Sequence, residues 1–449
     1  MSHRTRWSVP AIVAGSLACS AAVAHAAEPS QQQDMQQQIQ ALQQQIDQLK
    51  TAQQTAAASA TVDSVLKDAD LRSDPKLQAT ATDFTAGYKG GKFVLQSADG
   101  NFSLNPNFQL QVRNVTNHRE NGGEESTENG FELRRAKFGF AGNVYSKDLT
   151  YEFLWETNRN TGAVAMQDAW VRYRFAPSWL VRAGQFKDPL GKEQTGSSKR
   201  LLAAERSLLN ELLIGGDNYV QGLTLIYGPK EGPFKAEFGI TDGTQSANTN
   251  FLDDVGTPDT RADFGVAGRG EYQILGNDFK GYDDFTAMNQ TEPLLVLGAG
   301  VDFTQNGDSD LITYTVDAQF ETTKGLGLFG AIIGRSATVF NAAGDDADDI
   351  GFVLQAGQML GVTFAKAEWE AFGRVSYTDL DDARVADPFE SEVPELTIGV
   401  NGYFRGHSSK ITIDATYLPN GSPQNVDGAG ILQSDEDQFV LRAQYQLLI

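Results

Sequence analysis

The sequence predicts an all-β fold, an antiparallel barrel of sixteen strands preceded by a short helical segment. Three observations support this prediction. Apolar and polar residues alternate with a period of two from about residue 92 onward, short and long connections alternate along the chain, and the first residues have the pattern of an export signal. A chain of 449 residues with 45 Gly and 26 Phe is long enough for one large β domain plus an extension.

Residues 1–26 are predicted to be a secretory signal peptide. Two arginines lead into a mostly apolar run that ends at Ala24-His25-Ala26, which offers small residues for cleavage. The only cysteine, Cys19, lies within this signal, so we expect the exported chain to hold no disulfide and no thiolate metal site.

Residues 27–54 are rich in glutamine and are predicted to form a short coiled-coil helix, and residues 55–91 to form a linker. The coiled-coil interpretation rests on apolar residues spaced 4, 3, 4 and 3 apart. Fewer than three heptads are also compatible with a marginal helix or a low-complexity linker, and such a short seam fixes no oligomeric state. The seam residues are Met35, Ile39, Leu42, Ile46 and Leu49.

Residues 92–449 are predicted to form the barrel. After a short strand near 92–98, sixteen segments alternate, and single-chain bacterial barrels have an even number of strands. The segments are 107–117, 131–144, 148–157, 163–175, 179–187, 217–227, 233–241, 262–274, 293–304, 311–322, 326–336, 351–360, 366–379, 394–405, 409–418 and 437–449.

The connections favour a barrel that spans an outer membrane. Those after even-numbered segments are mostly short, whereas those after odd-numbered segments include most of the long polar ones, such as 118–130. Residues 187–216 are too long for a hairpin loop but would fit inside a wide lumen, so we expect an inward-folded third loop. One long connection, 275–292, departs from the pattern on the short-turn side.

The alternation also predicts which face meets lipid. In the last segment Phe439, Leu441 and Tyr445 share one face, and Arg442 and Gln444 lie on the other. Beyond residue 27 no apolar run is long enough for a membrane helix, so a spanning chain must be a closed barrel with its apolar face outward. The net charge of −22 disfavours nucleic acid as a partner.

Several basic residues are predicted to lie on the lumen face or in the long insertion. Basic side chains at a constriction attract anions. Basic side chains that pair with acidic ones across strands would instead leave a weakly selective pore, and both interpretations remain open. The candidate pore and constriction residues are Arg135, Lys137, Arg172, Arg174, Arg182, Lys187, Lys192, Lys199, Arg200 and Arg206.

Four motifs resemble the phosphate-selective porin O and P family of bacterial outer membranes. They are ELRRAKFGFAG (132–142), DAWVRYRF (168–175), VRAGQFKDPLG (181–191) and ERSLLNELL (205–213). The resemblance implies a sixteen-stranded porin that assembles as a homotrimer in the bacterial outer membrane, with its third loop folded inward and a pore that admits anions such as phosphate. Residues that match the family motifs are Arg182, Gln185, Phe186, Lys187, Pro189 and Gly191 on the strand and loop entry, and Glu205, Arg206 and Ser207 inside the loop.

We therefore predict an outer-membrane porin for passive diffusion of small hydrophilic solutes. Its expected partners are small hydrophilic solutes or inorganic anions, and outer-membrane lipid. The alternatives are a general-diffusion porin with weak selectivity, and a plugged barrel with a structural or adhesive role. An enzyme is not expected, nor a cofactor or metal. The sequence GLGLFG at 325–330 lies within an alternating strand, and the histidines after the signal, His118 and His407, are both expected in connections.

Overall fold

A computed structural model describes residues 84–89, 92–249, 262–338 and 345–449. The predicted signal peptide, the glutamine-rich segment and residues 55–83 of the predicted linker lie outside these ranges. No helix in the described ranges has the length and apolar character needed to cross a bilayer.

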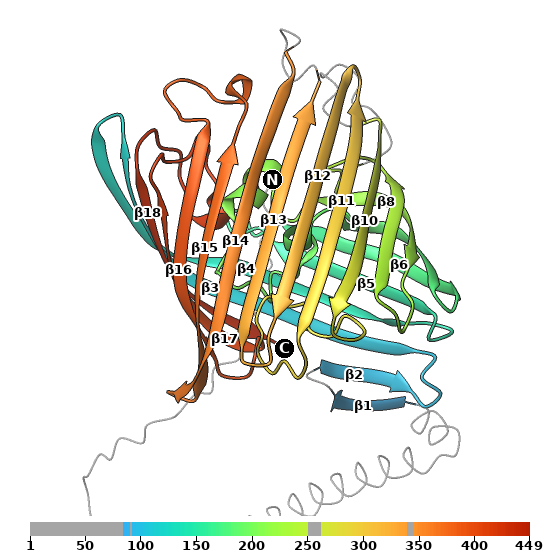
Figure 1. The fold of residues 1–449 in the computed structure, drawn as a ribbon. Helices are drawn as coiled ribbons and strands as arrows, with labels where there is room; N and C mark the ends of the chain where they lie inside the picture. The colour runs from blue at the N-terminus through green and yellow to red at the C-terminus, as the bar shows by residue number, and fades with distance from the viewer. Residues whose placement is uncertain (1–83, 90–91, 250–261, 339–344) are drawn as a thin grey trace, which may run out of the picture. The chain divides into compact units, whose positions relative to one another are not determined.

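The described strands all belong to one sheet, shown in Figure 1. They are β1 (Phe84–Lys89), β2 (Lys92–Ser97), β3 (Ser103–Asn121), β4 (Glu124–Asn143), β5 (Leu149–Thr157), β6 (Val164–Ala176), β7 (Trp179–Lys187), β8 (Tyr219–Tyr227), β9 (Phe234–Thr241), β10 (Phe264–Leu275), β11 (Leu294–Asn306), β12 (Ser309–Glu321), β13 (Leu326–Ala337), β14 (Ala347–Phe364), β15 (Ala367–Asp379), β16 (Glu392–Tyr403), β17 (Ser409–Leu418) and β18 (Gln438–Leu448). Short helices are α3 (Lys192–Thr195), α4 (Leu208–Leu213), η1 (Asp382–Arg384) and η2 (Asp427–Ala429).

Strands β3 to β18 form a closed ring. Each pairs antiparallel with the next, and β18 pairs with β3 from Gln438 opposite Arg119 to Leu448 opposite Gln109. Closure leaves no unpaired strand edge in the ring. The predicted fold class, an all-β antiparallel barrel of sixteen strands, is confirmed, and the predicted segments 179–187 and 409–418 coincide with β7 and β17.

The structure differs from the sequence-based expectation in two places. Residues 118–130, expected to form a long connection, instead continue β3 and β4, which meet at the two-residue turn Gly122-Gly123 with φ of 61° and 77°. Both faces of these strand ends are polar, so no alternation marks them, and His118 lies in β3 rather than in a connection. Within the predicted linker, β1 forms a hairpin with β2, and β2 pairs briefly with β3.

The barrel exposes its apolar side chains and buries its polar ones. In β18, Phe439 and Tyr445 are each 43% exposed, whereas Arg442 and Gln444 are 1% and 3% exposed. Other strands repeat the pattern, with Val316 exposed beside a buried Asp317 in β12. This arrangement is the reverse of a soluble sandwich, whose apolar faces pack together in the core.

Residues 188–218, which we call the inner segment, connect β7 to β8 and pack against the inner face of the barrel wall. Helix α4 contacts β13, β14 and β15, and the leucines of the segment cluster with wall residues such as Phe329 and Phe372. Leu209 of α4 is fully buried, and a Cβ on Gly351 of β14 would lie only 2.4 Å from its Cδ1. An apolar patch on an otherwise polar inner wall therefore holds this segment.

Replacing Leu209 with Ala should loosen the inner segment without opening the barrel. Leu→Ala at a fully buried site costs about 2–5 kcal/mol, which would raise the population of the detached segment by roughly 30-fold or more. We expect trypsin to cut faster after Lys199 or Arg200 in the folded, detergent-solubilised variant. Leu223→Ala is the matched control, because Leu223 is 53% exposed on the outer face. Equal cleavage rates in the two variants would contradict the packing described here.

Candidate pore and its constriction

The inner segment begins and ends at neighbouring points of the wall. The Asp188 amide donates to the Asn218 carbonyl at 3.0 Å, and the Lys187 ammonium donates to the carbonyls of Gln194 and Gly196 at 3.1 and 2.8 Å. The side-chain amide of Gln194 in α3 donates to the Asp217 carbonyl at 3.0 Å. These bonds close the base of the segment, so its middle part must cross the interior of the barrel.

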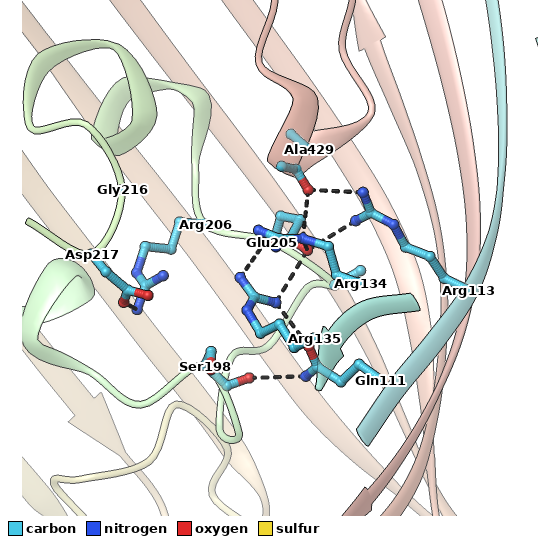
Figure 2. A network of polar contacts seen from close by, with 12 residues as sticks. Gln111, Arg113, Arg134, Arg135, Ser198, Glu205, Arg206, Gly216, Asp217 and Ala429 are labelled. Atoms are coloured by element: carbon cyan, nitrogen blue, oxygen red, sulfur yellow. Dashed lines mark hydrogen bonds and ion pairs between the residues drawn. The ribbon is translucent and has the colours of Figure 1, made fainter. Parts of the chain in front are cut away.

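The carboxylate of Glu205 is the centre of the largest charged cluster on this segment. Glu205 is 1% exposed, and its oxygens accept hydrogen bonds of 2.7–3.2 Å from the guanidinium groups of Arg113, Arg134 and Arg135. Figure 2 shows the three arginines converging on it from β3 and β4. Burial favours the neutral acid, but the three arginines hold the pKa of Glu205 far below its ordinary value.

A β-bulge in β4 explains why two consecutive arginines reach the same carboxylate. Arg135 lies opposite Gln111 and Leu133 lies opposite Val112, so the register shifts at Arg134. Successive side chains of a regular strand point to opposite faces, and the extra residue of a bulge removes that alternation locally. The bulge therefore places Arg134 beside Arg135 on the inner side.

A second cluster joins the inner segment to the end of β7. Asp217 forms an ion pair with Arg206 at 2.6 Å (Figure 2). Lys187 lies 2.6 Å and Lys137 lies 3.8 Å from the same carboxylate. Burial opposes the charge on Asp217, but Arg206 and Lys187 outweigh it and hold the pKa of Asp217 well below its ordinary value. This side of the segment is thus held by a charged carboxylate shared among cations.

Carboxylates of the opposite wall bind the backbone of the inner segment. Asp414 accepts from the Ala204 amide at 2.8 Å, and Glu395 accepts from the Leu208 amide at 2.9 Å. Arg374 donates to the Glu205 carbonyl at 2.9 Å and pairs with Glu395 at 2.7 Å. The segment is therefore fixed to both sides of the barrel interior.

Among the described residues, two cavities that share lining residues lie beside the inner segment. One, of about 330 Å³, lies between the segment and the wall formed by β3 to β9, and the other, of about 810 Å³, reaches the C-terminal residue Ile449. Both are lined by Thr195, Ser197 and Lys199 of the segment, so they adjoin each other along this stretch. The smaller cavity is also lined by Lys137, Arg182 and Lys187 and by Glu152, Asp168 and Glu237.

The structure separates the candidate pore bases into two groups. Six of them line a cavity, namely Lys137, Arg182, Lys187, Lys192, Lys199 and Arg200. Four do not line either cavity: Arg135 and Arg206 are buried in ion pairs, Arg172 lies over the Trp170 ring, and Arg174 donates to the turn carbonyls of Pro177 and Gly228.

Sequence reasoning missed Arg113 and Arg134, which bind Glu205. Arg113 follows the inward alternation of β3 and could have been included on that ground. The Arg134-Arg135 doublet places two long charged side chains in succession within a strand, and such a doublet is the only sequence sign of the bulge.

Two ionisable groups of the inner segment have shifted pKa values near neutrality. Burial raises the pKa of the Glu211 carboxyl to about 7, an effect that Arg206 opposes and Glu205 reinforces. Burial lowers the pKa of the Lys192 ammonium to about 8. The charge of the inner segment therefore changes within the range of pH in which most bacteria live.

Part of the chain is similar to a known protein family, and its barrel is similar to solved structures. Residues 102–320 match the family model of phosphate-selective porins O and P. Among solved structures, an anion-selective porin from Comamonas acidovorans is similar at 14% identity and a TM-score of 0.57, over 78% of this chain and 100% of that porin. Salmonella typhi OmpF in complex with daunomycin matches at 13% identity and a TM-score of 0.49, over 77% of this chain and 98% of OmpF.

The likeness to the Comamonas acidovorans porin, at this identity, is a likeness of fold. No curated protein sequence matches the chain. The matched stretch 102–320 contains the inner segment and the arginines of β3 and β4 that bind Glu205, as well as the four motifs noted in the sequence. This stretch is therefore similar to the phosphate-selective porin O and P family, and the barrel has the fold of a porin.

Proposed function

We propose that the protein forms a water-filled channel through the bacterial outer membrane, in which the inner segment narrows the lumen and small hydrophilic anions such as phosphate diffuse passively. The observation that carries this proposal is the smaller cavity beside the inner segment. Its charged lining contains the bases Lys137, Arg182, Lys187 and Lys199 against three acids. An excess of fixed positive charge at the narrowest part favours anions by Coulomb attraction and by replacing part of their hydration.

The apolar exterior supports the membrane location. Aromatic and branched side chains cover the outside of the ring, and a surface of this kind is stable against acyl chains. We further propose export through the N-terminal signal and assembly as a homotrimer, for which the family resemblance is the support. The matched family model and the similar fold are those of channel proteins.

The ion pairs in the lining favour a second candidate, a general-diffusion porin of weak selectivity. Arg182 pairs with Glu237, and Lys187 pairs with Asp217. A base that already faces a carboxylate exerts a smaller net field on a passing ion. We therefore expect a modest anion preference rather than strict phosphate specificity. A plugged structural barrel, the third candidate, requires that the two cavities fail to connect.

Planar-bilayer recordings separate these candidates. Purified protein should produce discrete current steps, and the reversal potential under a potassium chloride gradient should show chloride passing more readily than potassium. Adding phosphate should reduce the chloride current if phosphate enters the same path. A silent protein would favour the plugged barrel, and a preference for potassium would contradict the anion channel.

Lys199 lines both cavities, so its charge should influence selectivity. Reversing a charge about 5 Å from the ion path in water changes the energy of an ion by about 1–2 kcal/mol before screening, so Lys199→Glu should lower the chloride-to-potassium permeability ratio roughly fivefold. Lys230→Glu is the matched control, because Lys230 is exposed in the turn between β8 and β9. If both variants keep the wild-type ratio, the inner segment does not set selectivity.

Selectivity should also depend on pH through Glu211, whose pKa is raised to about 7 from 4.5. The folded protein holds this proton more tightly than the unfolded chain does. Protonation of Glu211 therefore stabilises the fold fully below pH 4.5, and this contribution to the free energy of unfolding is lost as the pH rises through 7. At pH 6 the neutral carboxyl removes one negative charge from the lumen, so the chloride-to-potassium ratio should be higher than at pH 8. Glu211→Gln should reduce this difference and leave only the part that comes from Lys192, whose pKa of about 8 also falls in this range. Glu231→Gln, in an exposed turn, should preserve the full difference.

A further inference from the structure

The connection between β10 and β11, residues 276–293, is long on a rim where the other turns are short. At that rim the remaining turns are 144–148, 177–178, 228–233, 322–325, 365–366 and 404–408, each of two to six residues. A turn of that length is sufficient to join antiparallel neighbours. The additional residues of 276–293 therefore serve some purpose other than joining two strands.

This connection folds back into the barrel and packs there. Phe279, Tyr282 and Phe285 are each 5–6% exposed, and the Phe285 ring lies 5.1 Å from the Phe329 ring of β13 in an edge-to-face arrangement. A loop that stayed outside the rim would expose such large apolar side chains to water. Burial therefore fixes the connection at the inner wall.

Polar contacts extend across several strands of the wall. Thr286 donates to Glu370 of β15 at 2.6 Å, and the carbonyl of Asp284 accepts from Gln319 of β12 at 2.6 Å. The Asp284 carboxylate pairs with His407, in the turn between β16 and β17, at 2.8 Å. The connection is consequently held from β12 to the turn between β16 and β17.

The same connection contacts the inner segment. The Lys192 ammonium donates to the Tyr282 carbonyl and lies 3.8 Å from the centre of the Tyr282 ring and 5.5 Å from that of Phe285. Arg200 forms an ion pair with Asp283. These contacts engage both ends of the stretch 192–200, which contains the residues that line both cavities.

The connection also changes the charge of the larger cavity. Asp283 and Asp284 line that cavity opposite Lys199 and Arg200 of the inner segment. Asp283 is 73% exposed at its side chain, so its charge acts on the water of the cavity as well as on Arg200. Two carboxylates thus offset the bases that the inner segment supplies.

We infer that residues 276–293 form a second constriction element, which enters the lumen from the rim opposite the inner segment, holds Lys192 and Arg200 in place and limits the anion preference of the pore. This inference rests on the proposed channel function and extends it to a further determinant of selectivity. The connection acts in two separable ways, by occupying space and by carrying charge.

Shortening the connection tests its effect on pore size. Residues 276–293 are replaced by the four-residue turn Thr322–Gly325, which already joins β12 to β13 in this chain. In planar bilayers the single-channel conductance of the shortened protein should rise by about half or more, because conductance increases with the open cross-section of a pore. Unchanged conductance in a folded barrel would overturn the inference.

Point substitutions test the charge while leaving the connection intact. Asp283→Asn should raise the chloride-to-potassium permeability ratio about twofold, since one negative charge leaves the larger cavity. Asp278→Asn is the matched control, because Asp278 is an exposed acid of the same connection that does not line that cavity. Equal ratios in the two variants would overturn the inference even if the shortened protein failed to fold.

The outcomes for this inference differ from those for the channel itself. A wild-type protein that produced no current steps would contradict the proposed function and, with it, the second constriction element. The other outcome is a wild-type protein that conducts, with the same conductance in the shortened protein and the same permeability ratio in Asp283→Asn. That outcome would keep the channel and would remove only the role given to residues 276–293.

Discussion

Closure of the strand ladder is the constraint on which the rest of the structure depends. Because β18 pairs with β3, each strand of the ring has a partner on both sides, and its backbone amides and carbonyls need neither water nor another chain. Only such a structure, or a helix, is stable in hydrocarbon. Closure also fixes the direction of every second side chain, so the polar residues of each strand face the interior. That interior is too wide for the side chains of the wall alone to fill.

The interior is filled by segments that enter from both rims, and their attachment follows from the energetics of buried charge. An isolated buried carboxylate is strongly destabilising, whereas one that accepts several charge-assisted hydrogen bonds is tolerated. Glu205 satisfies this condition through Arg113, Arg134 and Arg135, and Glu395 satisfies it through Arg374. Several bases that face the lumen are thus used to hold the segments inside it.

The sequence was sufficient to predict the ring of strands but not the contacts inside it. Alternation with a period of two depends only on which face of a strand meets water, so β7 and β17 could be delimited to the residue. Alternation fails where both faces are polar, as at 118–130. It also carries no information on which side chains meet across the lumen, so Arg135 and Arg206 were grouped with Lys199 although they are bound to Glu205 and Asp217. The length of 275–292 was visible, but the contacts of Tyr282 and Phe285 depend on the tertiary fold.

Site-directed spin labelling in lipid vesicles tests most directly whether the apolar exterior meets lipid while the interior holds water. Single cysteines are placed at Leu441, on the outer face, and at Ser197, which lines both cavities, in a chain whose only native cysteine is Cys19. The label at 441 should collide with oxygen, which dissolves in acyl chains, and the label at 197 with a water-soluble nickel chelate. A label at 441 that is accessible to the nickel chelate, or one at 197 that is accessible only to oxygen, would contradict the account.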